Sequence, residues 1–295
     1  MKAPGNTPCI RLPEWESTLG LDGIWVKDES ANPTGTYKDR RSAAIVQQAT
    51  KQLVDKLVLI SAGNAAYSLA KYAEDSGIEV HAVIDRNLTA GIKSVLQRVC
   101  KQVIEVELGA KLLQSDELIA MVRTSPGELI WNVSNGFHDA YKQIVLELQR
   151  DLPHQPDSIA MPFGGGEAMV GVALGVADAR WQDRTTVVGF HNNQSERLKT
   201  SAFCKAYVTY LRADKMPCTP VIDMTTSEPL DGVQRNYVPA GLRVEEAGSN
   251  TFQAVRVFAH NDRQENKVGN HFGKNIVIVN SGYGKVLEEA GMANT

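Results

Sequence analysis

The stretch KLVLISAGNAAYSLAKYAEDSGIEVHAVID, residues 56–85, places an amphipathic segment between two short apolar runs. The runs KLVLIS and EVHAVID have the length of buried strands, and residues 65–76 between them carry apolar side chains at helical spacing. A glycine-containing turn, SAGN, joins the first run to the helix. This order of strand, helix and strand predicts a βαβ unit with two parallel strands.

The same alternation extends along the chain as far as residue 190. Further strands are predicted at KQVIEVEL (101–108), ELIWNV (128–133), DSIAMPF (157–163), TTVVGF (185–190) and NIVIVN (275–280). Helices are predicted over 38–54, 91–99, 111–124, 137–150 and 167–180. Between about 191 and 270 the periodicity weakens and predicts loops or short elements. The fold class is therefore α/β with mainly parallel sheets.

Composition excludes several classes of protein. The chain has 295 residues, 43% of them hydrophobic and 22% charged, with a net charge of −3 and scattered basic residues, which argues against a nucleic-acid partner. Its four cysteines form no CxxC pair and have no histidine at ligand spacing, so we expect reduced thiols and no metal. No stretch approaches the roughly 20 apolar residues of a membrane span. We expect a cytoplasmic protein without a membrane partner.

Three predicted strands run into turns that contain glycine, and in open α/β sheets ligands bind beyond the carboxyl ends of the strands. In SAGN, 61–64, backbone N–H groups and the helix start favour a carboxylate, although Ser61 or Asn64 could instead cap the helix. In GGGE, 164–167, three glycines can form a nest for phosphate, or merely a flexible turn, and Glu167 opposes phosphate unless its side chain turns away. In NSGYGK, 280–285, the Ser281 hydroxyl could meet a ring nitrogen or simply end the sheet.

Lys38 follows a turn-forming run in NPTGTYKDRR, 32–41, and falls on the first turn of a predicted helix. Most such lysines are surface charges. A lysine buried near the strand ends would instead lose stability in its charged form and become a nucleophilic amine able to form a Schiff base. We expect Asp28 and Glu29 to be solvated loop charges, and Arg40 and Arg41 to form surface ion pairs.

Four segments together resemble the motifs of fold type II pyridoxal-phosphate (PLP) enzymes, the tryptophan synthase β family. They are KDESANPTGTYKDR (27–40), SAGNAAYSLAKYA (61–73), PFGGGEAMVGVALG (162–175) and VNSGYGK (279–285), similar in order to the lysine motif, the Ser-x-Gly-Asn loop, the phosphate loop and the terminal Ser/Thr-Gly turn. They are most similar to threonine synthases, and also similar to cysteine synthases and to serine or threonine dehydratases. The resemblance implies two three-layer α/β domains, a smaller one of residues 35–145 and a larger PLP-binding one of residues 1–34 and 146–295.

The resemblance also implies a role for each site residue. Lys38 would hold pyridoxal 5′-phosphate as an aldimine and would move protons during catalysis, Asn64 would bind the 3′-hydroxyl, and Ser281 would meet the pyridine nitrogen. The phosphate would bind the backbone of Gly164, Gly165 and Gly166, with the amides of Glu167 and Ala168. Ser61, Ala62, Gly63 and Asn64 would receive the substrate carboxylate.

The implied activity is β-elimination or β-replacement on a small L-amino acid, with or without an activated oxygen, by a homodimer. One alternative is threonine synthase activity on O-phospho-L-homoserine, although His138 stands where threonine synthases carry an arginine. A second alternative is a catalytically weak PLP-binding relative with a partner-binding role, suggested by Glu167 and the irregular segment 191–270.

Overall fold

The computed structural model describes residues 1–108, 113–191, 221–223 and 238–292, and these form two separate sheets. The smaller sheet has four parallel strands in the order β5-β4-β3-β6. These strands are β3 (Lys56–Ile60), β4 (Glu79–Asp85), β5 (Gln102–Val106) and β6 (Ile130–Asn132). The strand that opens the 56–85 stretch, β3, therefore pairs with β4 on one side and β6 on the other.

The larger sheet has six strands in the order β1-β2-β10-β7-β8-β9. They are β1 (Cys9–Arg11), β2 (Gly23–Asp28), β7 (Ser158–Pro162), β8 (Thr186–His191), β9 (Val221–Asp223) and β10 (Asn275–Asn280). All neighbours are parallel except β1, which runs antiparallel to β2. The late strand β10 thus lies in the middle of this sheet. The predicted α/β class with mainly parallel sheets is confirmed.

Helices cover both faces of the smaller sheet. Side chains of α2 (Lys38–Lys51), α3 (Asn64–Ala73) and α4 (Ala90–Val99) form one buried cluster with Leu57 and Leu59 of β3. The alternate residue Val58 faces the other side, where α5 (Ser115–Val122) packs. Successive side chains of KLVLI therefore pack alternately into two hydrophobic cores, one on each face of the sheet, which explains why the run is apolar throughout.

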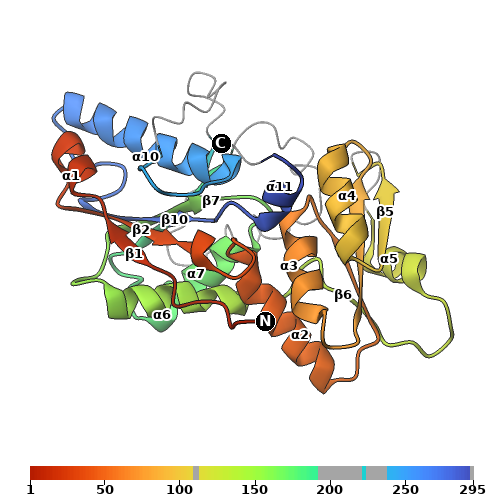
Figure 1. Ribbon diagram of the computed structural model, residues 1–295. Coiled ribbons are helices and arrows are strands. Elements are labelled where there is room, and N and C mark those ends of the chain that lie inside the picture. The colour runs from red at the N-terminus through yellow and green to blue at the C-terminus, as the bar shows by residue number, and fades with distance from the viewer. Residues whose placement is uncertain (109–112, 192–220, 224–237, 293–295) are drawn as a thin grey trace.

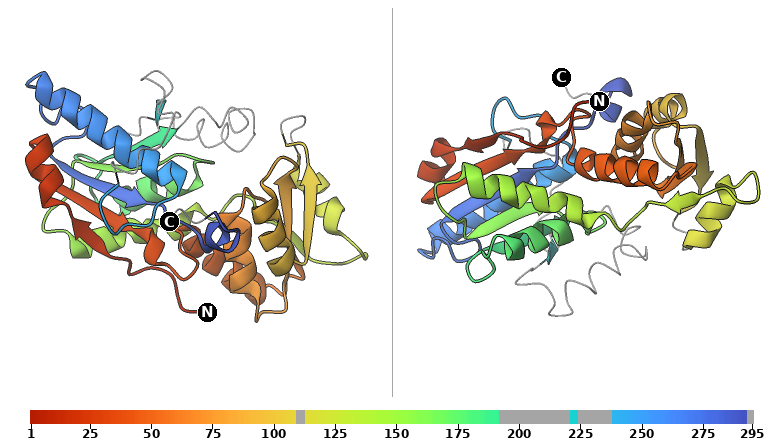
Figure 2. Two further views of the ribbon diagram at one scale, coloured as in Figure 1. Left: turned by 45° about the horizontal axis from the view of Figure 1, so that its top comes forward. Right: turned by 90° about the horizontal axis from the view of Figure 1, so that it is seen from below.

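Helices also cover both faces of the larger sheet, as Figure 1 shows. On one face lie α1 (Pro13–Leu19) and α10 (Glu246–Gln264), and on the other α6 (Lys142–Asp151) and α7 (Glu167–Asp178). Short elements join these layers: η1 (Glu29–Ala31), η2 (His138–Tyr141) and α11 (Lys285–Glu289). Both views of Figure 2 place the two sheets at opposite ends of the molecule.

One expectation about secondary structure is wrong. Residues 246–264, expected to be irregular, form the 19-residue helix α10. Its buried face includes Phe252, Val255 and Ala259, at helical spacing, which packs on β10 and β7. Residues 192–220 and 224–237 of the weakly periodic segment lie outside the described residues, as do the first two residues of the helix expected over 111–124.

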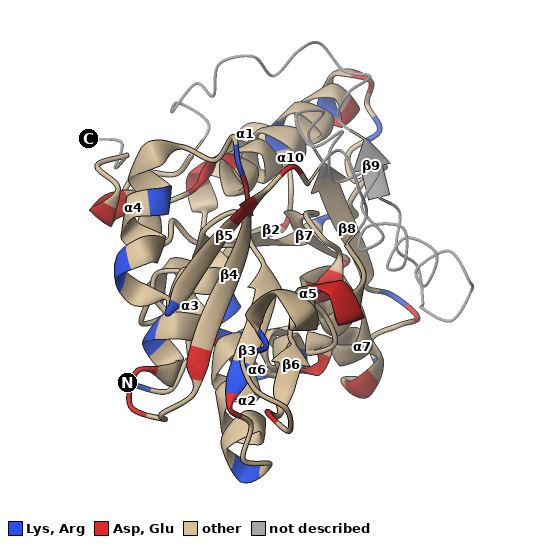
Figure 3. Cartoon of the chain, turned by 90° about the vertical axis from the view of Figure 1, so that its right-hand side faces the viewer, with Lys and Arg blue, Asp and Glu red and all other residues tan. Residues whose placement is uncertain are grey.

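The proposed division into residues 35–145 and the remainder stays a prediction. The strands of the smaller sheet all come from 56–132, but α2 packs on α3 beside that sheet and also pairs, through Arg40, with Glu147 of α6 beside the larger one. Basic and acidic residues are interspersed on the side seen in Figure 3. Within the described residues, no helix has both the length and the apolar character needed to cross a bilayer.

Candidate active site

The loop before Lys38 is hydrogen-bonded to the turn that follows β10. The Tyr37 N–H donates to the Ser281 carbonyl at 3.0 Å, and the Thr36 hydroxyl donates to the same oxygen at 3.1 Å. In return, the Gly284 N–H donates to the Gly35 carbonyl at 2.9 Å. Thr36 also forms a β-bridge with Gly282, a close backbone contact that leaves no room for a side chain there. The lysine loop is thereby fixed to the carboxyl end of the central strand of the larger sheet.

Lys38 itself begins α2 and is partly buried. Its Nζ lies 4.6 Å from the ring centre of Tyr37. The next residue, Asp39, is fully buried and accepts hydrogen bonds from the Thr34 N–H at 2.6 Å and the Ser68 hydroxyl at 2.7 Å. Burial raises the pKa of Asp39, and these hydrogen bonds oppose the rise. Asp39 therefore fastens the start of α2 to both the preceding loop and α3.

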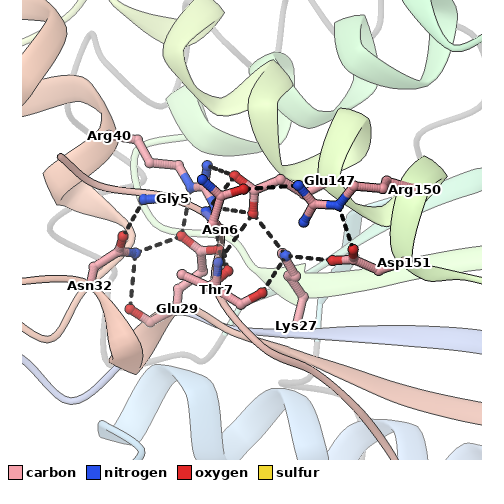
Figure 4. Close-up of polar contacts among 10 residues, drawn as sticks. All are labelled: Gly5, Asn6, Thr7, Lys27, Glu29, Asn32, Arg40, Glu147, Arg150 and Asp151. Carbon is pink, nitrogen blue, oxygen red and sulfur yellow. Dashed lines mark hydrogen bonds and ion pairs between the residues drawn. The ribbon is translucent and has the colours of Figure 1, made fainter.

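Arg40 is not on the surface, contrary to expectation. It is 5% exposed, and its guanidinium contacts Glu29 at 2.7 Å and Glu147 at 2.8 Å. Glu29, expected in solvent, is fully buried. Lys27, also fully buried, contacts Glu147 at 2.8 Å (Figure 4). A sequence-based prediction missed these buried charges because the anion that Arg40 and Lys27 share, Glu147, lies on a distant segment, 107 residues from Arg40.

Arg41 is also buried, contrary to the expected surface ion pair, and its partner is Glu167. The two side chains approach to 3.0 Å, and the other Glu167 oxygen accepts from the Phe137 N–H at 3.0 Å. The Glu167 carboxylate is therefore neutralised by Arg41, with its side chain directed to η2 and α2. The anticipated conflict between Glu167 and a phosphate does not arise.

The glycine loop connects β7 to the first turn of α7. Gly166 has φ of 89°, a conformation that favours glycine. A Cβ atom placed on Gly164 or Gly165 would meet no other atom within 4 Å among the described residues. The start of α7, including the buried residues Glu167 and Ala168, directs its free N–H groups toward this loop. Such a loop suits a phosphate group.

In the SAGN turn, Ser61 caps the start of α3. Its hydroxyl oxygen accepts from the N–H groups of Gly63 at 3.0 Å and Ala66 at 3.1 Å, and its own N–H is bonded to Val83 in the sheet. Ala62 is exposed at the tip of the turn. Ser61 therefore shapes the turn, and the role of Ser61, Ala62 and Gly63 in binding a substrate carboxylate stays a prediction.

Asn64 and Ser281 are brought together by Glu245, a residue that the sequence did not single out. The Asn64 amide donates to one oxygen of Glu245 at 2.7 Å, and the Ser281 hydroxyl donates to the other at 3.0 Å. Burial raises the pKa of Glu245 to about 6, opposed by these hydrogen bonds and by the charge of Lys38. Asn64 and Ser281 thus converge on one carboxylate, and Lys38 follows Tyr37, whose N–H is bonded to Ser281.

The raised pKa predicts a pH-dependent loss of stability. The folded-state pKa of Glu245, about 6, exceeds its ordinary value of 4.5, so the folded state holds the proton more tightly and stability falls as pH rises from about 4 to 7. Lys38 and Glu246 are the charged groups that act on it. The free energy of unfolding of the cofactor-free proteins is measured by urea titration. Over this range, wild type should lose at most about 2 kcal/mol of stability relative to Glu245→Gln. Parallel pH profiles would contradict this.

Gly284 is a second residue on which the site depends. A Cβ atom there would lie 1.8 Å from the Asn64 side-chain oxygen, in a backbone conformation with φ of 78°. We expect Gly284→Ala to displace Asn64 and to weaken PLP binding about tenfold or more, measured by titration of the cofactor's absorbance. Gly127→Ala is the matched control, because Gly127 has φ of 86° with no atom within 4 Å among the described residues. Equal PLP affinity in the two variants would contradict a role for this contact.

The fold and these converging residues define a class. Two mainly parallel sheets, each covered by helices on both faces, with Lys38, the glycine loop and the Ser281 turn near strand ends, fit the fold type II PLP enzymes that the sequence resembles. The model of the family described as "Pyridoxal-phosphate dependent enzyme" matches residues 1–282, and the chain belongs to this family. Pyridoxal 5′-phosphate is accordingly its cofactor.

Curated relatives share part of the chain. A threonine synthase from Methanocaldococcus jannaschii is 30% identical over 169 residues, which are 54% of this chain and 40% of the relative. An L-serine dehydratase/L-threonine deaminase from Mus musculus is 28% identical over 176 residues, 57% of this chain and 51% of the relative. The matched region thus spans about half or less of these relatives.

Solved structures match almost the whole chain. A PLP-dependent aspartate racemase has a TM-score of 0.71 at 17% identity, with 94% of this chain and 89% of that chain covered. Maize serine racemase has a TM-score of 0.71 at 20% identity, with 95% and 88% covered. Threonine deaminase isoform 2 from Solanum lycopersicum has a TM-score of 0.69 at 16% identity, with 98% and 89% covered. At these identities the likeness defines the fold alone.

Proposed function

We propose that this protein catalyses β-elimination or β-replacement on a small L-amino acid, with or without an activated oxygen. The observation that carries the proposal is the convergence of Lys38, Asn64 and Ser281 at the carboxyl ends of strands from both sheets. When bound, the cofactor supplies an electron sink for the substrate's α-carbon. The homodimer and the small amino-acid substrate implied by the resemblance are part of this proposal.

The residues present fit the cofactor. The glycine loop lies at the start of α7, where backbone N–H groups suit a dianionic phosphate, and the Glu167 charge is already paired with Arg41. Asn64 supplies amide donors for the 3′-hydroxyl, and Ser281 supplies a hydroxyl for the ring nitrogen.

Lys38 has two proposed tasks. Its Nζ would hold the cofactor covalently and, once released, would remove and return a proton at the substrate's α-carbon. Its partly buried position and the fixed loop before it favour both tasks, because the amine is held in place at the strand ends. The SAGN turn would orient the substrate through its carboxylate.

A second candidate is threonine synthesis from O-phospho-L-homoserine, favoured by the 30% identity to a threonine synthase. His138, in η2, stands where threonine synthases carry an arginine for the substrate's phosphate, and this favours the first proposal. The two reactions differ in the carbon from which the leaving group departs and in their products, so they can be separated directly.

The test is a substrate panel on PLP-reconstituted protein: serine, threonine, O-acetylserine, O-phosphoserine and O-phospho-L-homoserine. For β-elimination we expect a 2-oxo acid and ammonia from at least one of the first four, detected by a dehydrogenase-coupled assay. For β-replacement we expect a new β-substituted amino acid when sulfide is added as the nucleophile, detected by chromatography. Phosphate release with threonine formation from O-phospho-L-homoserine would establish the second candidate instead. Inversion of configuration alone, measured by chiral chromatography, would refute both.

A further inference from the structure

Glu245 lies at the meeting point of the two sheets. It immediately precedes α10, and its N–H donates to the Gly282 carbonyl at 3.0 Å, so its backbone is fixed to the same turn that holds the lysine loop. Asn64 reaches it from the first residue of α3, beside the smaller sheet, and Ser281 from the end of β10 in the larger one. One carboxylate therefore joins two proposed cofactor ligands that belong to different halves of the molecule.

We propose that Glu245 is a positioning residue of the cofactor site, which fixes the direction of the Ser281 hydroxyl and the Asn64 amide. The inference rests on the proposed roles of these two residues and adds a third that governs them. A carboxylate only accepts hydrogen bonds, so both partners must present donors to it.

The consequence for Ser281 is chemical. Its single hydroxyl hydrogen is engaged by Glu245 at 3.0 Å, so only its lone pairs remain for another group. A ring nitrogen facing these lone pairs is stabilised when it carries a proton. An unassisted serine hydroxyl could equally donate to an unprotonated nitrogen. Glu245 thus gives Ser281 part of the effect of a carboxylate placed directly at the ring.

The consequence for Asn64 is orientational. One amide hydrogen is engaged by Glu245 at 2.7 Å, and the side-chain oxygen lies against Gly284. The second amide hydrogen remains to donate to an oxygen of the cofactor. Rotation of the amide by half a turn would set its oxygen against the Glu245 carboxylate, which offers no donor. Glu245 therefore keeps Asn64 in a single orientation.

Glu245→Gln tests the inference with minimal change of shape. Glutamine presents an N–H in place of one acceptor, so either Asn64 must flip or Ser281 must accept instead of donate. Glu265→Gln is the matched control, since Glu265 is an exposed glutamate at the opposite end of α10. Both variants are reconstituted with PLP labelled with ¹⁵N in the ring, and the ring-nitrogen chemical shift and the PLP dissociation constant are measured.

We expect Glu245→Gln to move the ring-nitrogen shift toward the unprotonated value and to weaken PLP about tenfold, the worth of one hydrogen bond to a charged group. Glu265→Gln should match wild type. In a Ser281→Ala background, Glu245→Gln should no longer move the shift, because its action passes through Ser281.

An unchanged ring-nitrogen shift in Glu245→Gln, with normal PLP uptake by wild type, would overturn this inference and leave the proposed function standing. A change of equal size in the Ser281→Ala background would overturn it as well. A wild-type protein that takes up no PLP would overturn the proposed function and this inference together.

Discussion

Lys38→Ala should abolish the borohydride-reducible bond between the protein and PLP and lower turnover about 10³-fold or more, because the amine that holds the cofactor and moves the α-proton is removed. The measurement is borohydride reduction followed by peptide mapping, with turnover on the best substrate of the panel. Wild type should carry the reduced adduct on the peptide containing Lys38.

Lys51→Ala is the control for this variant. Lys51 lies at the exposed last position of the same helix, so its removal changes charge and helix composition without touching the strand ends. We expect it to keep both the adduct and the turnover of wild type. A reduced adduct on any lysine other than Lys38 would refute the assignment.

Glu147→Ala should destabilise the folded protein by about 3 kcal/mol or more, because it removes the anion shared by two buried cations. Glu147 contacts Arg40 and Lys27, each at 2.8 Å (Figure 4). It also accepts from the Asn6 N–H at 2.9 Å, which ties the N-terminal segment to α6. The free energy of unfolding is measured by urea titration at neutral pH.

Glu74→Ala supplies the contrast, since Glu74 pairs with Lys71 at the surface at 2.9 Å and should change stability by less than about 1 kcal/mol.

Arg40 lowers the pKa of Glu147 to about 2 against the opposing effect of burial. The contribution of the Glu147 carboxylate to the stability of the folded protein is therefore complete above pH 4.5 and lost as pH falls through about 2. The free energies of unfolding of Glu147→Gln and wild type should converge in acid. Equal losses of stability in Glu147→Ala and Glu74→Ala would show that the buried ion pairs of Glu147 contribute no more to stability than a surface ion pair.

The regular elements were predictable wherever apolar spacing was clean. All four strands of the smaller sheet follow from short apolar runs between helices. α10 was missed because a dense set of charges at its end, in HNDRQENK, obscured the buried positions Phe252 and Val255. The strand β2 was not predicted, because GIWVKD carries the fully buried Lys27 and a lysine normally indicates a surface position.

The predicted cofactor residues follow strands through glycine turns, a local pattern that can be seen in the sequence. Glu245 has no such signal: it follows no described strand, and its partner Asn64 lies 181 residues away in the chain. The same reason explains the errors at Arg40 and Arg41. One of the two Arg40 counterions, Glu147, is 107 residues away, and only folding reveals that the Arg40 charge is paired with it.

The hydrogen bond from Thr36 to Ser281 joins residues separated by 245 positions. During synthesis, the lysine loop leaves the ribosome long before the turn to which it is fastened exists, and contacts of such separation form late because the loop they close is long. The smaller sheet can assemble from its own contiguous residues, whereas the lysine loop must wait for β10 to insert between β2 and β7. We therefore expect cofactor capture to follow completion of the larger sheet, as a final step of maturation rather than a nucleus for folding.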